Sequence, residues 1–170
     1  MGLCLLFVGS LDTMKVLFKS YSFLETEMSP AILDTATAKS RILQLIEKNP
    51  FVSFGTLGSD NWPDLRVLLV AAKDGVESVW FATSADSAKI AELKRNPKAV
   101  IYGYEMEPMA EFRLFGNVEL LSDSASRQKI WQDDFLQYFP GGIDSPEMIV
   151  MRFDTDHGVY ECYGKESGKF

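Results

Sequence analysis

The chain has 170 residues, of which 46% are hydrophobic and 24% are charged, a balance typical of a single globular domain. This balance excludes a disordered chain, a collagen-like repeat and a disulfide-rich scaffold. The 17 basic and 24 acidic residues give a net charge of −7, which argues against nonspecific nucleic-acid binding because such binding depends on neutralising phosphates.

The first 35 residues are predicted to form a weakly structured extension. Their apolar run Leu3–Val8 is too short to span a bilayer, and no basic residue precedes it as in a secretory signal. Met1-Gly2 matches the start of a myristoylation pattern, but Leu6 stands where serine or threonine is required. We therefore expect no membrane partner, and we place the core domain at residues 36–164 with a short tail at 165–170.

In the first half of this domain, apolar residues at helical spacing predict a helix that begins at Thr37 or Ala38 and ends at Asn49-Pro50. Asp74-Gly75 is a strong hairpin signal, and Ser84 or Asp86 is expected to cap a second helix that ends at Asn96-Pro97. Runs rich in β-forming residues predict three strands, Phe51–Leu57, Leu65–Ala72 and Val79–Thr83.

In the second half, two strands flank a turn at Glu107-Pro108, and Gly116 is expected to mark a bend or bulge. A helix is predicted over Ser124–Tyr138. The predicted strands are Lys98–Tyr104 and Glu111–Leu121, followed by a final pair, Met148–Phe153 and Val159–Tyr163.

Most of these strands are joined by hairpins, and helices stand between only some of them. A parallel sheet requires a crossover after every strand, so the order of elements favours an antiparallel sheet. The predicted fold class is α+β, a mainly antiparallel split β-barrel of Greek-key type with flanking helices.

Cysteine and histidine are scarce, which limits the metal and redox chemistry open to the chain. Cys4 and Cys162 lie at opposite ends and form no CxxC pair, so we expect neither a disulfide framework nor a structural zinc site. His157 is the single histidine, which excludes a His-rich metal site and makes a Ser-His-Asp triad a poor candidate. We predict no metal and a reducing, cytoplasmic compartment.

Arg66 lies within an otherwise apolar predicted strand. A buried charge without a partner is costly, so we expect its guanidinium to face an anion, a carboxylate or the mouth of the barrel. The alternative is an arginine on an edge strand that points into water.

A candidate anion site lies where the third strand leads into the second helix. Helix N-termini offer unpaired backbone N–H groups, and the hydroxyls of Thr83, Ser84 and Ser87 with the Lys89 ammonium would complete a phosphate site there. Asp86 weakens this interpretation, because a carboxylate repels phosphate. The alternative is a helix cap beside a solvated lysine.

Taken in order, these segments resemble the FMN-binding split barrels related to pyridoxamine 5′-phosphate oxidase. The segments that carry the resemblance are Arg66–Leu69, Phe81–Thr83, Ser87–Lys89 and Asn96-Pro97. Trp131, the run Phe139–Gly142 and the final hairpin Met148–Tyr163 are closer to the branch called general stress protein 26. The resemblance covers residues 36–164.

The resemblance implies that Arg66, Ser87 and Lys89 would hold the phosphate of FMN, with FAD as the alternative flavin. Many relatives carry a further cation where this chain has Ala88. This departure is expected to weaken the affinity for FMN.

The resemblance also implies the contacts of the isoalloxazine ring. The backbone of Val67, Leu68 and Leu69 would line the ring, and Ala82 with Thr83 would bound the ring and the ribityl chain. Aromatic side chains that could stack on the ring, or belong to the core instead, are Tyr102, Tyr104 and Trp131.

Glu111 falls where the oxidases place a flavin-contacting glutamine contributed by the second subunit, so the resemblance implies a homodimer with flavin at its interface. A negative charge at Glu111 departs from that pattern. The arginine and histidine with which the oxidases hold pyridoxal phosphate have no counterpart after Tyr163, and we therefore reject vitamin B6 oxidation as the function.

Three functions remain open at this point. The first is a flavin-dependent oxidoreductase acting on an unidentified small molecule, and the second is a flavin-binding stress protein without turnover. The third is a haem-binding split barrel, in which His157, a tyrosine or Cys162 would be the ligand.

Overall fold

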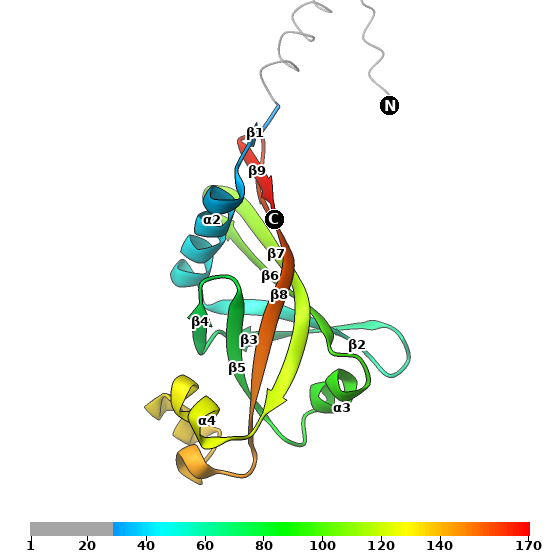
Figure 1. Ribbon diagram of the computed structural model, residues 1–170, viewed down its shortest axis with the longest axis vertical. Coiled ribbons are helices and arrows are strands. Elements are labelled where there is room, and N and C mark those ends of the chain that lie inside the picture. Colours follow the sequence, from blue (N-terminus) through cyan, green and yellow to red (C-terminus); the bar gives the residue numbers. More distant parts are fainter. Residues whose placement is uncertain (1–28) are drawn as a thin grey trace, which may run out of the picture.

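The computed structural model of the protein describes residues 29–170, so the predictions for Leu3–Val8 and Cys4 lie outside the described residues (Figure 1). The strands are β1 (Ala31–Ile32), β2 (Phe51–Leu57), β3 (Pro63–Leu69), β4 (Ala72–Asp74), β5 (Ser78–Ser84), β6 (Lys98–Met106), β7 (Met109–Leu121), β8 (Met148–Cys162) and β9 (Glu166–Lys169). The α-helices are α2 (Thr35–Lys48), α3 (Ala88–Arg95) and α4 (Ser124–Ile130).

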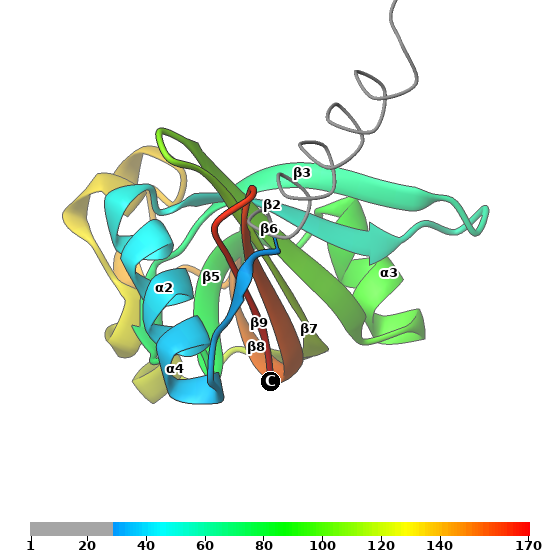
Figure 2. The same ribbon diagram turned by 90° about the horizontal axis from the view of Figure 1, so that it is seen from above.

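The strands form one mostly antiparallel sheet in the order β1-β9-β8-β7-β6-β2-β3. β5 pairs with β8, and β4 pairs with β5, both antiparallel. The pair β1–β9 is parallel. In the described part of the chain the sheet is not closed, because β3 pairs only with β2 and β4 pairs only with β5. Seen from above, the sheet is strongly curved (Figure 2). The predicted α+β class with a mainly antiparallel sheet is confirmed.

Helix α2 begins earlier than predicted because Asp34 caps it. The Asp34 carboxylate accepts a hydrogen bond from the backbone N–H of Thr37 at 2.7 Å, which satisfies one of the unpaired donors of the first turn. The helix ends before Asn49, as predicted from the proline that follows. It buries Ala38, Ile42 and Ile46 against the sheet.

Phenylalanines from three strands form the centre of the core. Phe54 on β2 meets Phe81 on β5 edge to face at 5.3 Å between ring centroids, and Phe153 on β8 at 6.4 Å. All three are completely buried, and Ile42 and Ile46 of α2 belong to the same cluster. Since such aromatic pairs add to the free energy gained from burial, this cluster fixes β2, β5 and β8 relative to one another.

The prediction of two separate final strands is wrong. Met148–Cys162 is one continuous strand, because the residues between the two predicted strands also pair with β7. The register shifts between Phe115 and Gly116, which confirms the expected bulge and takes up the bend that this long pairing requires.

The prediction of one strand over Leu65–Ala72 is also wrong. β3 ends at Leu69, and the chain then changes partners: Val70 N–H donates to Pro50, whereas Ala71 N–H donates to Trp80 on β5. Both ends of the described chain add to the sheet as well. β9 lies within the segment expected to be a tail and β1 within the expected extension, and the two strands pair with each other.

The predicted helix Ser124–Tyr138 is broken in the structure. α4 stops at Ile130, Trp131 leaves the helical conformation, Gln132 takes an extended backbone conformation, and a 3₁₀ turn follows over Asp133–Gln137. The reason is tertiary packing. Phe135 and Phe139 are buried in a second apolar cluster with Trp80 of β5, and this burial outweighs the local preference for a continuous helix.

Candidate flavin site

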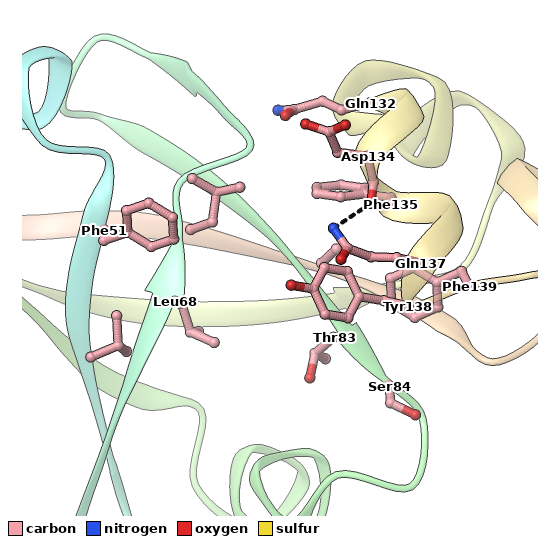
Figure 3. A pocket seen from close by; sticks show the side chains of 13 residues that line it. Phe51, Leu68, Thr83, Ser84, Gln132, Asp134, Phe135, Gln137, Tyr138 and Phe139 are labelled. Atoms are coloured by element: carbon pink, nitrogen blue, oxygen red, sulfur yellow. Dashed lines mark hydrogen bonds between the residues drawn. The ribbon is translucent and has the colours of Figure 1, made fainter.

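A cavity of about 600 Å³ lies between β3, β5 and the 3₁₀ turn, within the range of small-molecule sites in proteins. Figure 3 shows Leu68 and Phe51 on one side of it, the residues Gln132–Phe139 on the other, and Thr83 between them. Five residues that were predicted to contact the flavin ring line this cavity: Val67, Leu68, Leu69, Ala82 and Thr83. The structure therefore brings together five of the predicted site residues around one cavity.

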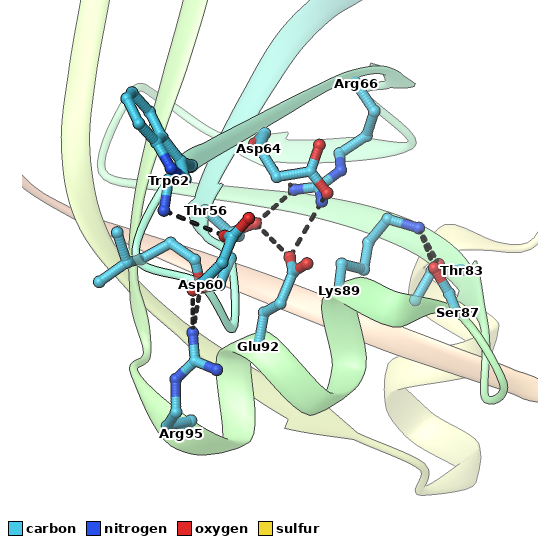
Figure 4. Close-up of polar contacts among 12 residues, drawn as sticks. Thr56, Asp60, Trp62, Asp64, Arg66, Thr83, Ser87, Lys89, Glu92 and Arg95 are labelled. Atoms are coloured by element: carbon cyan, nitrogen blue, oxygen red, sulfur yellow. Dashed lines mark hydrogen bonds and ion pairs between the residues drawn. The ribbon is translucent and has the colours of Figure 1, made fainter.

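Lys89 lies next to this cavity and faces hydroxyl groups. Its ammonium donates to the Thr83 hydroxyl at 2.9 Å and also to the Ser87 hydroxyl (Figure 4). Among residues 29–170, no carboxylate lies within 4.0 Å of the ammonium. Burial, and then the nearby Arg66 guanidinium, lower the pKa of Lys89 below its ordinary value. A half-buried cation beside two hydroxyls is a suitable site for an anion.

Ser87, not Ser84 or Asp86, precedes helix α3. The predicted cap is wrong because the Ser84 hydroxyl donates to the Asp86 carboxylate within the turn, and the helix begins only at Ala88. The Ser87 hydroxyl makes no capping bond and is left to accept from Lys89.

Arg66 is paired with carboxylates, one of the three environments expected for it. Its guanidinium donates to Glu92 at 2.9 Å and also to Asp64 and to the Thr56 hydroxyl (Figure 4). The side chain of Arg66 is 18% exposed and that of Glu92 is 10% exposed. Thr56 in turn donates to Glu92, so three polar groups from β2, β3 and α3 form one buried network.

The sequence interpretation did not include Glu92 and Thr56. The available signal was the spacing of Lys89 and Glu92, three positions apart on α3, which places both side chains on one helix face. That face is turned toward β2 and β3. Residues Gln132–Phe139 were missed as a cavity wall because their position depends on the packing that breaks the predicted helix.

Glu111 lies apart from the cavity within one chain. It accepts a hydrogen bond from the Tyr102 hydroxyl at 3.0 Å and is 3.3 Å from the Arg113 guanidinium. Burial, together with the Glu111 carboxylate, raises the pKa of Tyr102. Tyr104 stacks on Tyr102 at 6.1 Å between centroids, and both line a smaller cavity of about 210 Å³ beside Phe51.

The other singled-out residues are not at the large cavity. His157 stacks on Phe115 at 4.7 Å and borders a separate small cavity. Cys162 is buried as a free cysteine, and Trp131 packs edge-on against Phe135. Residues 29–170 contain no cluster of three or more metal-binding side chains, and none of their helices is long and apolar enough to cross a bilayer.

Comparison with known proteins agrees with this arrangement of strands. The family model described as pyridoxamine 5′-phosphate oxidase matches residues 38–162. The chain belongs to the pyridoxamine 5′-phosphate oxidase family. None of the curated proteins compared with the chain matches it.

Solved structures with the same fold include a relative of general stress protein 26 of Bacillus subtilis, from Clostridium acetobutylicum. It is 28% identical, with a TM-score of 0.73 over 81% of this chain and 96% of that one. An FMN-binding protein related to pyridoxamine 5′-phosphate oxidase, from Nostoc punctiforme, is 19% identical, with a TM-score of 0.60 over 78% and 85%. A haem-binding protein from Mycobacterium smegmatis is 16% identical, with a TM-score of 0.65 over 81% and 58%.

Proposed function

We propose that this member of the pyridoxamine 5′-phosphate oxidase family binds FMN and is a flavin-dependent oxidoreductase acting on a small molecule. The observation that carries the proposal is the half-buried Lys89 ammonium, which faces two hydroxyls beside a cavity of suitable size. We also propose that the incomplete sheet is a split barrel. The scarcity of cysteine supports a cytoplasmic location, which we propose as well.

Lys89, Thr83 and Ser87 fit a phosphate group. Each hydroxyl accepts a hydrogen bond from the ammonium, and among residues 29–170 its own O–H has no acceptor, so it can donate to a phosphate oxygen. Arg66 supplies a second positive charge, held in place by Glu92 and Thr56. Since Glu92 and Asp64 together carry as much negative charge as Arg66 and Lys89 carry positive charge, we expect an affinity that rests on hydrogen bonds as well as on charge.

Strand β3 fits the ring. Its one edge pairs with β2, and in the described residues no strand pairs with the other edge, which leaves backbone N–H and C=O groups for the polar edge of a heterocycle. Val67, Leu68 and Leu69 lie on this strand, and Ala82 gives the room of a small side chain opposite. Bound flavin would supply the electron transfer, and the chain would supply binding and orientation.

We further propose a homodimer, because one face of the sheet exposes large apolar side chains. Phe51 is 57% exposed, Leu65 64%, Val67 67% and Tyr104 57%. Pairing of β3 with β2 and of β2 with β6 places these four on neighbouring strands. Exposed apolar patches of this kind mark interaction surfaces, and a second copy would cover the patch while bringing Glu111 toward the partner's flavin.

The test is the visible spectrum of the purified protein. We expect a yellow protein with the absorption bands of oxidised flavin, and mass spectrometry of the released cofactor to identify FMN rather than FAD. A colourless protein that takes up neither flavin would refute the proposal. Bleaching of the bound flavin by NADH or NADPH, with recovery on adding an acceptor, separates an oxidoreductase from a flavin-binding protein without turnover.

The affinity for FMN is expected to fall with rising pH. The fall should begin at a lower pH than it would for a lysine with an ordinary pKa. The ammonium form of Lys89 binds the phosphate, and its pKa is lowered from 10.5, so the charge is lost as the pH rises through that lowered pKa. Fluorescence titration with FMN from pH 7 to pH 10.5 measures this.

Two controls make the pH test specific. Riboflavin has the same ring without the phosphate and should not show the additional loss. Lys89→Arg keeps its charge throughout this range and should remove the loss for FMN. An equal pH dependence for FMN and riboflavin would show that Lys89 does not bind the phosphate.

A further inference from the structure

The large cavity has two ends of opposite electrostatic character. At one end, Lys89 donates to Thr83, with Arg66 nearby. The 13 residues that line the cavity, however, include no lysine, arginine or histidine, and their one ionisable carboxylate is Asp134, on the far wall (Figure 3). The two ends therefore favour different ligand groups.

The chain around this wall strengthens the negative end. Residues 131–147 contain no lysine, arginine or histidine, and they contain four acidic residues, Asp133, Asp134, Asp144 and Glu147. In the described part of the chain none of the four forms a salt bridge. Among residues 29–170, these four carboxylates therefore keep their negative charge without a cationic side chain within 4.0 Å.

The remaining groups of the wall favour a flat, aromatic ligand. Phe135 and Phe139 border the cavity but are almost fully buried and pack on each other, so they give the wall an apolar base. Tyr138 is 67% exposed, and its ring is the one on this wall that can stack on a planar ligand. The amides are already engaged: Gln132 donates to the Ala71 carbonyl at 3.3 Å, and Gln137 donates to the Asp134 carbonyl at 3.0 Å. The Asp134 carboxylate is thus the charged acceptor left on the wall for a ligand.

Resting on the flavin site proposed above, we propose that the wall Gln132–Phe139 selects a neutral or cationic aromatic substrate and rejects an anionic one. Asp134 is the specificity-determining residue. A carboxylate or phosphate on a ligand against this wall would lie within several ångströms of Asp134, and at an effective dielectric constant between those of water and protein this repulsion weakens binding about tenfold.

The experiment compares three probes that share one ring system: 2-naphthylmethylamine, 2-naphthalenemethanol and 2-naphthoate. Their binding to the full chain is measured by calorimetry at pH 7.5, with FMN added and without it. We expect the amine and the alcohol to bind, and the naphthoate to bind about tenfold more weakly than the alcohol. Naphthoate binding as tightly as the amine, or no binding by any probe, would overturn the inference.

Two variants assign the effect to one carboxylate. Asp134→Asn should bring naphthoate to within about twofold of the alcohol, because the local repulsion is removed. Asp133→Asn changes the neighbouring charge, which does not line the cavity, and should leave most of the discrimination intact. If the two variants change naphthoate binding equally, the discrimination comes from the summed negative charge of the segment and not from Asp134.

The two proposals fail in different ways. If FMN does not bind but the probes keep their order on the flavin-free chain, the proposed function is wrong and the selectivity of the wall stands. If FMN binds and the probes are not discriminated by charge, the flavin site stands and this inference is wrong.

Discussion

Replacing Arg66 with alanine is expected to abolish measurable FMN binding and to lower the free energy of unfolding by about 3 kcal/mol. The loss of binding follows from removing one of the two cations proposed for the phosphate. The loss of stability has a separate cause, because Glu92 is buried and would lose its positively charged partner. Fluorescence titration with FMN and urea unfolding followed by circular dichroism measure the two effects.

The double variant Arg66→Ala with Glu92→Gln separates these effects. Glutamine keeps the shape and a hydrogen-bond acceptor for Thr56 while removing the buried charge. We expect most of the lost stability to return and FMN binding to remain absent. Recovery of FMN binding in the double variant would mean that Arg66 serves only to neutralise Glu92 and does not contact the phosphate.

Leu65→Glu is expected to convert the proposed dimer to a monomer and, as a consequence, to weaken FMN binding by at least about tenfold. Leu65 is 64% exposed in the single chain and lines neither the large nor the 210 Å³ cavity. The substitution should therefore change the stability of the monomer by no more than about 0.5 kcal/mol. In a dimer it would instead bury an unpaired carboxylate in an apolar interface. Sedimentation equilibrium and FMN titration measure the outcome.

Ile32→Glu is the matched control for this prediction. Ile32 is also a highly exposed apolar residue, but it lies on β1, which pairs with β9 away from β3 (Figure 1). This variant should keep both the dimer and the FMN affinity. If Leu65→Glu remains dimeric, or if Ile32→Glu dissociates equally, the exposed face of β2, β3 and β6 is not the dimer interface.

Much of the secondary structure could be predicted because it depends on local signals. The proline after Asn49 ends α2, and Asp74-Gly75 makes the β4–β5 turn, where Gly75 has a φ of 61° that favours glycine. These features need only short stretches of chain to be recognised. The five cavity-lining residues on β3 and β5 were instead named from the resemblance to the family, and their contact with flavin stays a prediction.

Apart from the two helix starts, which depend on local caps, the errors share one physical cause, which is contact between segments distant in sequence. The predicted strand Leu65–Ala72 is divided because the backbone of Ala71 bonds to Trp80 on β5. The predicted helix Ser124–Tyr138 is broken because Phe139 packs in the apolar cluster that contains Trp80. Glu92 was missed because its role depends on Arg66, 26 residues earlier in the chain. The local spacing of Lys89 and Glu92 on α3 shows that the two share a helix face, but it does not identify Arg66 as the partner of Glu92.

By itself, the sequence determined the α+β class of the fold, most of its strands and helices, and the residue types available for an anion. Those properties follow from hydrophobic periodicity, turn residues and composition, which act along the chain. The residues expected around a planar ring came from the resemblance to the family. Only the tertiary structure decided that Arg66 is paired with Glu92 and that Lys89 faces two hydroxyls. It also decided that Asp134 lines the cavity wall across from β3. Charges act through space, so their partners are fixed only when β3, α3 and the 3₁₀ turn are packed together.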